Sequence, residues 1–167
     1  MTATHPIVLP NRIQQTLEDL ATCLCAEILD YGPPVCFCGV VPGTDVALDY
    51  TGDCNDVCGM AWVRLVTSYP SVSIGAPSTR PGNCSAGIGL DVEMGIVRCI
   101  DVGDGTQAPP PEELTASAHV QYQDMLTMYR AVSCCRQSKD WVLGNYNPFG
   151  PQGGLVGGML TMSILVL

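Results

Sequence analysis

The sequence predicts an α+β fold in which a mixed or antiparallel sheet is flanked by two helices, with the chain order α-β-β-β-α-β. Two patterns support this class: apolar residues recur at helical spacing in two segments, and they alternate or run together in several short ones. A chain of 167 residues is long enough for one hydrophobic core and hardly for two. We therefore expect a single domain over residues 1–167, with residues 1–10 as an extended arm.

The first helix is predicted to follow Asn11, which can cap it while Gln14 makes the return hydrogen bond of a capping box. Its end is expected at residues 31–34, where a glycine and two prolines follow a tyrosine. The apolar residues between these points form one stripe at helical spacing: Ile13, Leu17, Leu20, Leu24 and Ile28. Such a stripe needs a sheet or another helix to cover it.

Two strands are predicted in the next part of the chain. Residues 35–41 are rich in β-formers and bounded by Pro-Pro and Pro-Gly, and residues 46–50 are expected to continue or pair with that strand. Residues 51–59 contain many turn formers and are expected to be a loop. Residues 60–69 form the second strand. Its two faces are Ala61, Val63 and Leu65 on one side and Trp62 and Arg64 on the other.

The middle of the chain is predicted to contain a long loop and another strand. Residues 70–87 are dominated by small and turn-forming residues without periodicity, so we expect a long exposed loop. Residues 90–96 alternate apolar with polar or small residues, which indicates a half-buried strand with Gly95 as a bulge before residues 97–102. Residues 103–111 are expected to be a linker.

A second helix is expected from Glu112 to about Cys134, because acidic residues favour a helix N-terminus. Its predicted apolar stripe is Leu114, Ala118, Tyr122, Met125, Tyr129 and Val132. Residues 141–143 can add a short strand, and residues 146–158 are expected to be a second long loop because they are rich in glycine and proline. The last strand is residues 159–167, with one face formed by Leu160, Met162, Ile164 and Val166.

Charge and hydropathy exclude several classes of function. The net charge is −9, which is the wrong sign for a basic face that neutralises phosphates. The first ten residues lack the pattern of a secretory signal, and the longest apolar run, residues 155–167, is shorter than the roughly 20 residues that span a bilayer. Only 14% of residues are charged, which fits either a subunit that buries much of its surface or a compact monomer.

Ten cysteines invite a metal or disulfide interpretation. Only Cys54 and Cys58 have the spacing and turn residues of a zinc knuckle, and the second knuckle of such a site is missing. We expect the cysteines to be buried thiols in a reducing cytoplasm. Zinc at Cys54 and Cys58 is a weaker alternative, and the same two residues are the expected pair if a disulfide forms.

No catalytic centre and no cofactor site is predicted. The chain has two histidines, His5 and His119, and nothing near His119 in sequence supports a catalytic triad or dyad. The Gly-x-Gly sequences at 87–89 and 103–105 lack the third glycine and the strand–loop–helix context of a dinucleotide site. The sequence therefore favours a structural or binding protein over an enzyme.

Three segments carry a resemblance to a known family. They are Gly32-Pro-Pro-Val-Cys-Phe-Cys-Gly39, Met60-Ala-Trp-Val-Arg-Leu65 with Tyr69-Pro70-Ser71, and Gly150-Pro-Gln-Gly-Gly154 followed by Gly157-Gly158. With these segments the chain resembles the neck proteins of long-tailed actinobacteriophages, in particular the tail terminators. The resemblance implies a sheet covered by helices and a hexameric ring that caps the finished tail tube, stops its polymerisation and docks the head connector.

This resemblance also implies where the protein works and what it contacts. It implies a virion protein of the tail neck, assembled in the host cytoplasm, whose partners are copies of itself, the major tail tube protein and the stopper or connector proteins. Genomic DNA would pass through the channel without specific binding, helped by the excess of carboxylates, and no membrane is involved. Another neck ring, the stopper or the adaptor, is the alternative in the same class, and a small zinc-binding module or a cysteine-dependent enzyme are alternatives in other classes.

The two predicted long loops, with Tyr69 at the end of the strand before the first of them, supply the candidate interface residues, because long segments poor in apolar residues can order on binding. Ordinary solvent-exposed loops are the alternative. The candidates are Tyr69, Pro70, Ser71, Arg80, Asn147, Phe149 and Gln152.

Overall fold

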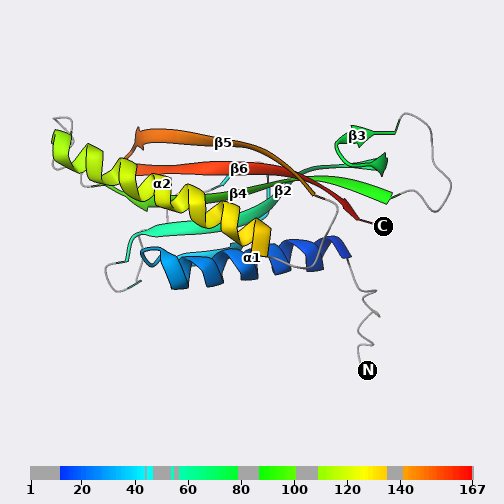
Figure 1. Cartoon of the computed structure of the whole chain (residues 1–167), viewed down its shortest axis with the longest axis horizontal. Coiled ribbons are helices and arrows are strands. Elements are labelled where there is room, and N and C mark those ends of the chain that lie inside the picture. Colours follow the sequence, from blue (N-terminus) through cyan, green and yellow to red (C-terminus); the bar gives the residue numbers. More distant parts are fainter. Residues whose placement is uncertain are drawn as a thin grey trace, which may run out of the picture.

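The computed structural model describes residues 12–43, 45–46, 54, 57–78, 87–100, 109–134 and 141–166, and it shows the predicted α+β class. A six-stranded mixed sheet forms one layer, and two helices form the other (Figure 1). The elements are α1 (Arg12–Tyr31), β1 (Phe37–Val40), β2 (Gly59–Ser73), β3 (Ala76–Pro77), β4 (Gly87–Cys99), α2 (Pro111–Cys134), β5 (Trp141–Gln152) and β6 (Leu155–Val166). The proposed N-terminal arm and the Asn11 cap lie outside the described residues.

The strand order in the sheet is β1-β2-β4-β6-β5, with β3 paired to β2 beside this path. β1 is parallel to β2, and all other pairs are antiparallel. β1 and β5 are therefore the two edges of the described sheet. The end of the sheet that carries β3 projects beyond both helices (Figure 1).

Both helices cover the same face of the sheet, and they enclose the main core. The predicted stripe of α1 is confirmed, since Leu17, Leu20, Leu24 and Ile28 are buried. The predicted face of β6 also points into this core, where Leu160, Met162 and Ile164 are buried. α1 ends at Tyr31, and the N–H of Gly32, which follows it, donates to the carbonyl of Ile28 at 2.9 Å. The two prolines that follow cannot continue the helix.

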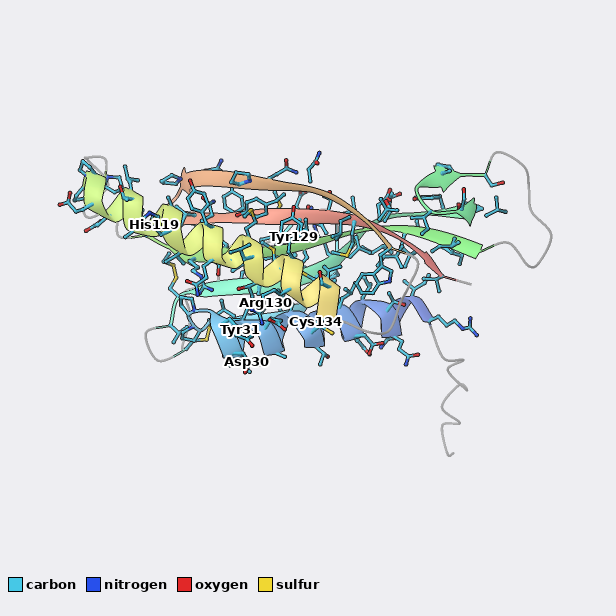
Figure 2. All side chains as sticks on the ribbon, viewed as in Figure 1. Asp30, Tyr31, His119, Tyr129, Arg130 and Cys134 are labelled. Atoms are coloured by element: carbon cyan, nitrogen blue, oxygen red, sulfur yellow. A yellow bond between two sulfur atoms is a disulfide. The ribbon has the colours of Figure 1, made fainter. Side chains whose placement is uncertain are left out.

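The two helices are also joined at their ends. Figure 2 shows Arg130 of α2 beside Tyr31 of α1, with the guanidinium 3.6 Å from the ring centroid. Arg130 also donates to the carboxylate of Glu27 at 3.0 Å, and this pair raises the pKa of Arg130. Neither α1 nor α2, the two helices of the described chain, combines the length and the apolar character that spanning a membrane requires.

A second, smaller apolar cluster lies on the sheet face that the helices leave open. Met60, Trp62 and Val97 are its buried members. Trp62 stands opposite Gly95 in the strand register, and its indole ring occupies the place where a Cβ of Gly95 would lie. The predicted bulge at Gly95 is therefore wrong, because this glycine makes room for the ring. The irregularity lies in β2, between Leu65 and Thr67.

The predicted loop over residues 146–158 is wrong, because these residues belong to a long β-hairpin. β5 continues to Gln152, and β6 already begins at Leu155. The turn between them is Gly153-Gly154, with φ angles of 58° and 81°. Two successive glycines with positive φ match the twist of a two-residue hairpin, and an edge strand tolerates prolines such as Pro148.

The predicted loop over residues 70–87 is also partly wrong. β2 extends to Ser73, and a turn through Gly75 leads into the short strand β3. Residues 79–86 lie outside the described residues, as do 47–50 and 101–108. The strand predicted over residues 97–102 ends at Cys99, with Ile100 after it, and residues 101 and 102 lie outside the described residues.

Candidate functional site

The first group of candidate interface residues lies on β2 and not in a loop. The hydroxyl of Tyr69 donates to Asp91 of β4 at 3.1 Å, and burial together with this carboxylate raises the pKa of Tyr69. Ser71 is fully buried, and its hydroxyl is within hydrogen-bond distance of the Ser73 carbonyl and 2.6 Å from that of Ala76. Ser71 therefore stabilises the β2–β3 turn, and Pro70 is the exposed member of this group.

The second group lies on β5. Asn147 and Gln152 are exposed, whereas Phe149 is half-buried and packs against the cluster around Trp62. The structure thus brings the candidates together in two places, at the β2–β3 turn and along β5. Arg80 lies outside the described residues.

β5 has an unusual composition for the edge of a sheet. Its 12 residues include no charged side chain, and in the described sheet it pairs only with β6. Two large apolar side chains, Val142 and Leu143, are exposed on it. Natural edge strands are usually protected from pairing with other chains by charges, short length or a covering element. Pro148 and Pro151 give such protection only to the second half of β5.

The outer side of α2 adds apolar surface near this edge, which corrects the predicted stripe. Leu114 and Tyr122 were expected to face the core, but both are exposed, as is Leu126. We call this surface the β5–α2 margin and define it by Leu143, Tyr122 and Leu126, since Leu143 pairs with Met162 and faces the helix side of the sheet. The buried face of α2 consists of Asp124, Thr127, Met128, Ala131 and Val132.

An open groove lies at the opposite edge of the sheet, between α1 and β1. Its volume is about 740 Å³. Leu29, which is 80% exposed, forms part of its wall. Most of the other lining residues are small, and the lining includes Ala21, Cys25, Ala26, Leu29, Gly39 and Val40. We call it the α1–β1 groove.

A buried ion pair joins the sheet to α2. Arg98 of β4 donates through Nε and Nη2 to the two carboxylate oxygens of Asp124, at 2.7 Å each, and through Nη1 to the carbonyl of Pro34 at 3.1 Å. Asp124 is only 2% exposed. The pair borders a cavity of about 420 Å³ beside Val120 and Val156. Since Asp124 and Arg98 are engaged with each other, and Arg98 also with the backbone at Pro34, the pair has a structural role.

A polar network occupies the open face of the sheet. Glu93 accepts two hydrogen bonds from Arg64, at 2.7 and 2.9 Å, and one from the indole of Trp62 at 3.1 Å. The hydrogen bond to Glu93 raises the pKa of Arg64. Residues 90–96 were predicted to form a half-buried strand, but Glu93 is buried, and Asp91 accepts hydrogen bonds from Tyr69 and Ser163.

The expectation of buried free thiols is wrong for most described cysteines. Three disulfides join Cys25 to Cys38, Cys36 to Cys54, and Cys58 to Cys99. The predicted pairing of Cys54 with Cys58 is also wrong, because each pairs with a different partner. Cys23 is disulfide-bonded as well, and Cys134 is an exposed free thiol. Among the described residues no cluster of cysteine, histidine and carboxylate side chains could hold a metal ion.

Of the two histidines considered as catalytic groups, the structure describes one. His119 is exposed in the first half of α2 (Figure 2), and His5 lies outside the described residues. The buried ionisable groups described above are engaged in ion pairs that tie elements together. The described residues form two candidate contact surfaces, the β5–α2 margin and the α1–β1 groove. No protein-family model matches the sequence, and no curated protein shows significant similarity to it.

Proposed function

We propose that this chain is a structural virion protein that forms a hexameric ring at the top of a phage tail tube. The ring terminates polymerisation of the tube and joins the tail to the head connector. The proposal rests on the resemblance of the three sequence segments to tail terminators. The observation that carries it further is the fold, since a mixed sheet covered by helices is what that resemblance implies.

The distribution of charge supports a protein that works by contact and not by chemistry. Three arginines of the described chain are paired with carboxylates: Arg64 with Glu93, Arg98 with Asp124, and Arg130 with Glu27. Exposed carboxylates remain on the helices, for example Glu18, Asp30 and Glu112. A surface of this kind repels a phosphate backbone. DNA can therefore move past the protein without being held.

Electron microscopy of tails assembled with and without the protein tests the proposal. We expect tubes of unregulated length in its absence and tubes of uniform length when the protein is supplied again. Tubes of normal length that fail to join heads would contradict termination and favour a stopper or an adaptor. Counting subunits in the ring separates these further, since six copies fit a terminator or a stopper and twelve fit an adaptor.

A further inference from the structure

We infer that neighbouring subunits of the ring join when the β5–α2 margin of one copy packs into the α1–β1 groove of the next. The inference builds on the proposed function, which supplies the ring, and it identifies the two surfaces that close it. The occupant of the groove is thus a second copy of this chain.

The position of the two surfaces is the first argument. β1 and β5 are the two edges of the described sheet, and the groove and the margin lie at these opposite edges. A contact between two different surfaces of the same chain is heterologous, and it generates a ring when the rotation between copies closes. Surfaces at opposite edges allow every subunit to use both at once.

The direction of the edge strands is the second argument. β1 runs parallel to β2, and three antiparallel steps lead from β2 through β4 and β6 to β5. β5 therefore runs opposite to β1. When β5 of one copy approaches β1 of the next with the helices on the same side, the two strands are antiparallel, which is the more frequent arrangement between neighbouring strands.

The chemistry of the two surfaces is the third argument. The margin presents large apolar side chains, among which Tyr122 is 56% and Leu143 is 41% exposed. The groove is lined by small residues such as Ala21, Ala26 and Gly39, which leave room for large side chains. Leu29 at its wall is nearly free of contacts in the isolated chain, so docking would bury it together with Leu143. Burial of an exposed leucine stabilises a contact between subunits.

β5 also leaves polar atoms unsatisfied in the isolated chain. The indole nitrogen of Trp141 and the hydroxyl of Tyr146 are buried without a hydrogen-bond partner in the described structure. Such atoms are rare in native proteins, and each of them destabilises the folded state. Both belong to the first half of β5, the part without prolines. A small shift of this segment on docking is therefore favourable if it brings these two atoms to hydrogen-bond partners.

Single substitutions at the two surfaces provide the test. Leu29→Glu disables the groove and Leu143→Glu disables the margin. Both side chains are exposed, so we expect folded proteins with unchanged circular dichroism. Val72→Glu is the matched control, because Val72 is 76% exposed on β2 at the far end of the sheet. In native mass spectrometry of the full chain we expect rings for the wild type and for V72E, and monomers for L29E and L143E.

Mixing the two disabled variants distinguishes this contact from a general loss of assembly. L29E retains its margin and L143E retains its groove, so one intact contact is possible between them. We expect a heterodimer that cannot grow, because its remaining margin and groove are both disabled. Rings from either single variant, rings from the mixture, or a wild type that stays monomeric at every concentration would overturn the inference.

A photo-crosslinking side chain in place of Leu143 supplies a second measurement that does not depend on disrupting the contact. We expect cross-links between copies to peptides that contain α1 or β1. Cross-links confined to other segments would overturn the inference. Rings that behave as expected in both measurements but leave tail length unregulated would contradict the proposed function alone.

Discussion

Replacement of Asp124 by asparagine tests how strongly the Arg98–Asp124 pair stabilises the packing of α2 on the sheet. The carboxylate accepts two hydrogen bonds of 2.7 Å and is 2% exposed, so the substitution leaves the Arg98 guanidinium buried without its counter-charge. Removing one partner of a buried pair costs about 3–5 kcal/mol. We expect D124N to lower the free energy of unfolding by about that amount.

The double variant Arg98→Met with Asp124→Leu shows whether the loss comes from the pair or from packing. Replacing both partners by apolar residues of similar size is often neutral or stabilising by about 1–4 kcal/mol. Arg98 also donates to the Pro34 carbonyl, and loss of this hydrogen bond offsets part of that gain. Urea unfolding followed by circular dichroism measures all three proteins. A loss below about 1 kcal/mol in D124N, or a loss in the double variant as large as that in D124N, would refute the reasoning.

Three further predictions concern the sheet, the disulfides and a buried tyrosine. Gly95→Ala should lower stability by about 1–3 kcal/mol, because the added Cβ meets the Trp62 ring. Gly150→Ala is the control and should change thermal stability little, because the space around Gly150 is open. Equal losses in the two variants would contradict the prediction. Loss of the Cys58–Cys99 disulfide through a double serine variant should cost about 2–5 kcal/mol, and an unchanged melting temperature would contradict the assigned pairing. Burial raises the pKa of Tyr146 to about 12. The contribution of the neutral phenol to stability is therefore complete below the ordinary pKa of 10.0 and is lost as pH rises towards 12. A tyrosinate titration should lose its highest-pH step in a Tyr146→Phe variant, and a titration curve that keeps this step would contradict the prediction.

The elements with strong local periodicity could be predicted from the sequence. α1 has apolar residues at every third or fourth position, so only one face of the helix can be the buried one. In the central parts of β4 and β6, apolar residues alternate with polar or small residues along the sequence. The β5–β6 hairpin was missed because glycine and proline are also frequent in loops. The Gly153-Gly154 pair between two apolar segments was the available signal.

The buried face of α2 and the disulfides could not be predicted in the same way. Asp124 and Thr127 interrupt the apolar pattern of α2, and Asp124 is buried only because Arg98, 26 residues away in sequence, neutralises it. Sequence spacing likewise does not define which cysteines pair, since the fold brings distant ones together. The same holds for the candidate surfaces, because the margin and the groove each combine residues from two elements.

The two tryptophans of the chain provide a built-in optical probe of the two sides of the sheet. Trp62 is buried on the open face and hydrogen-bonded to Glu93, so its emission should not depend on contacts at the sheet edges. Trp141 begins β5 and is only partly buried. In a Trp62→Phe protein the single remaining fluorophore lies at the β5 edge of the sheet. Its emission can therefore follow contact between subunits in real time, without any attached dye.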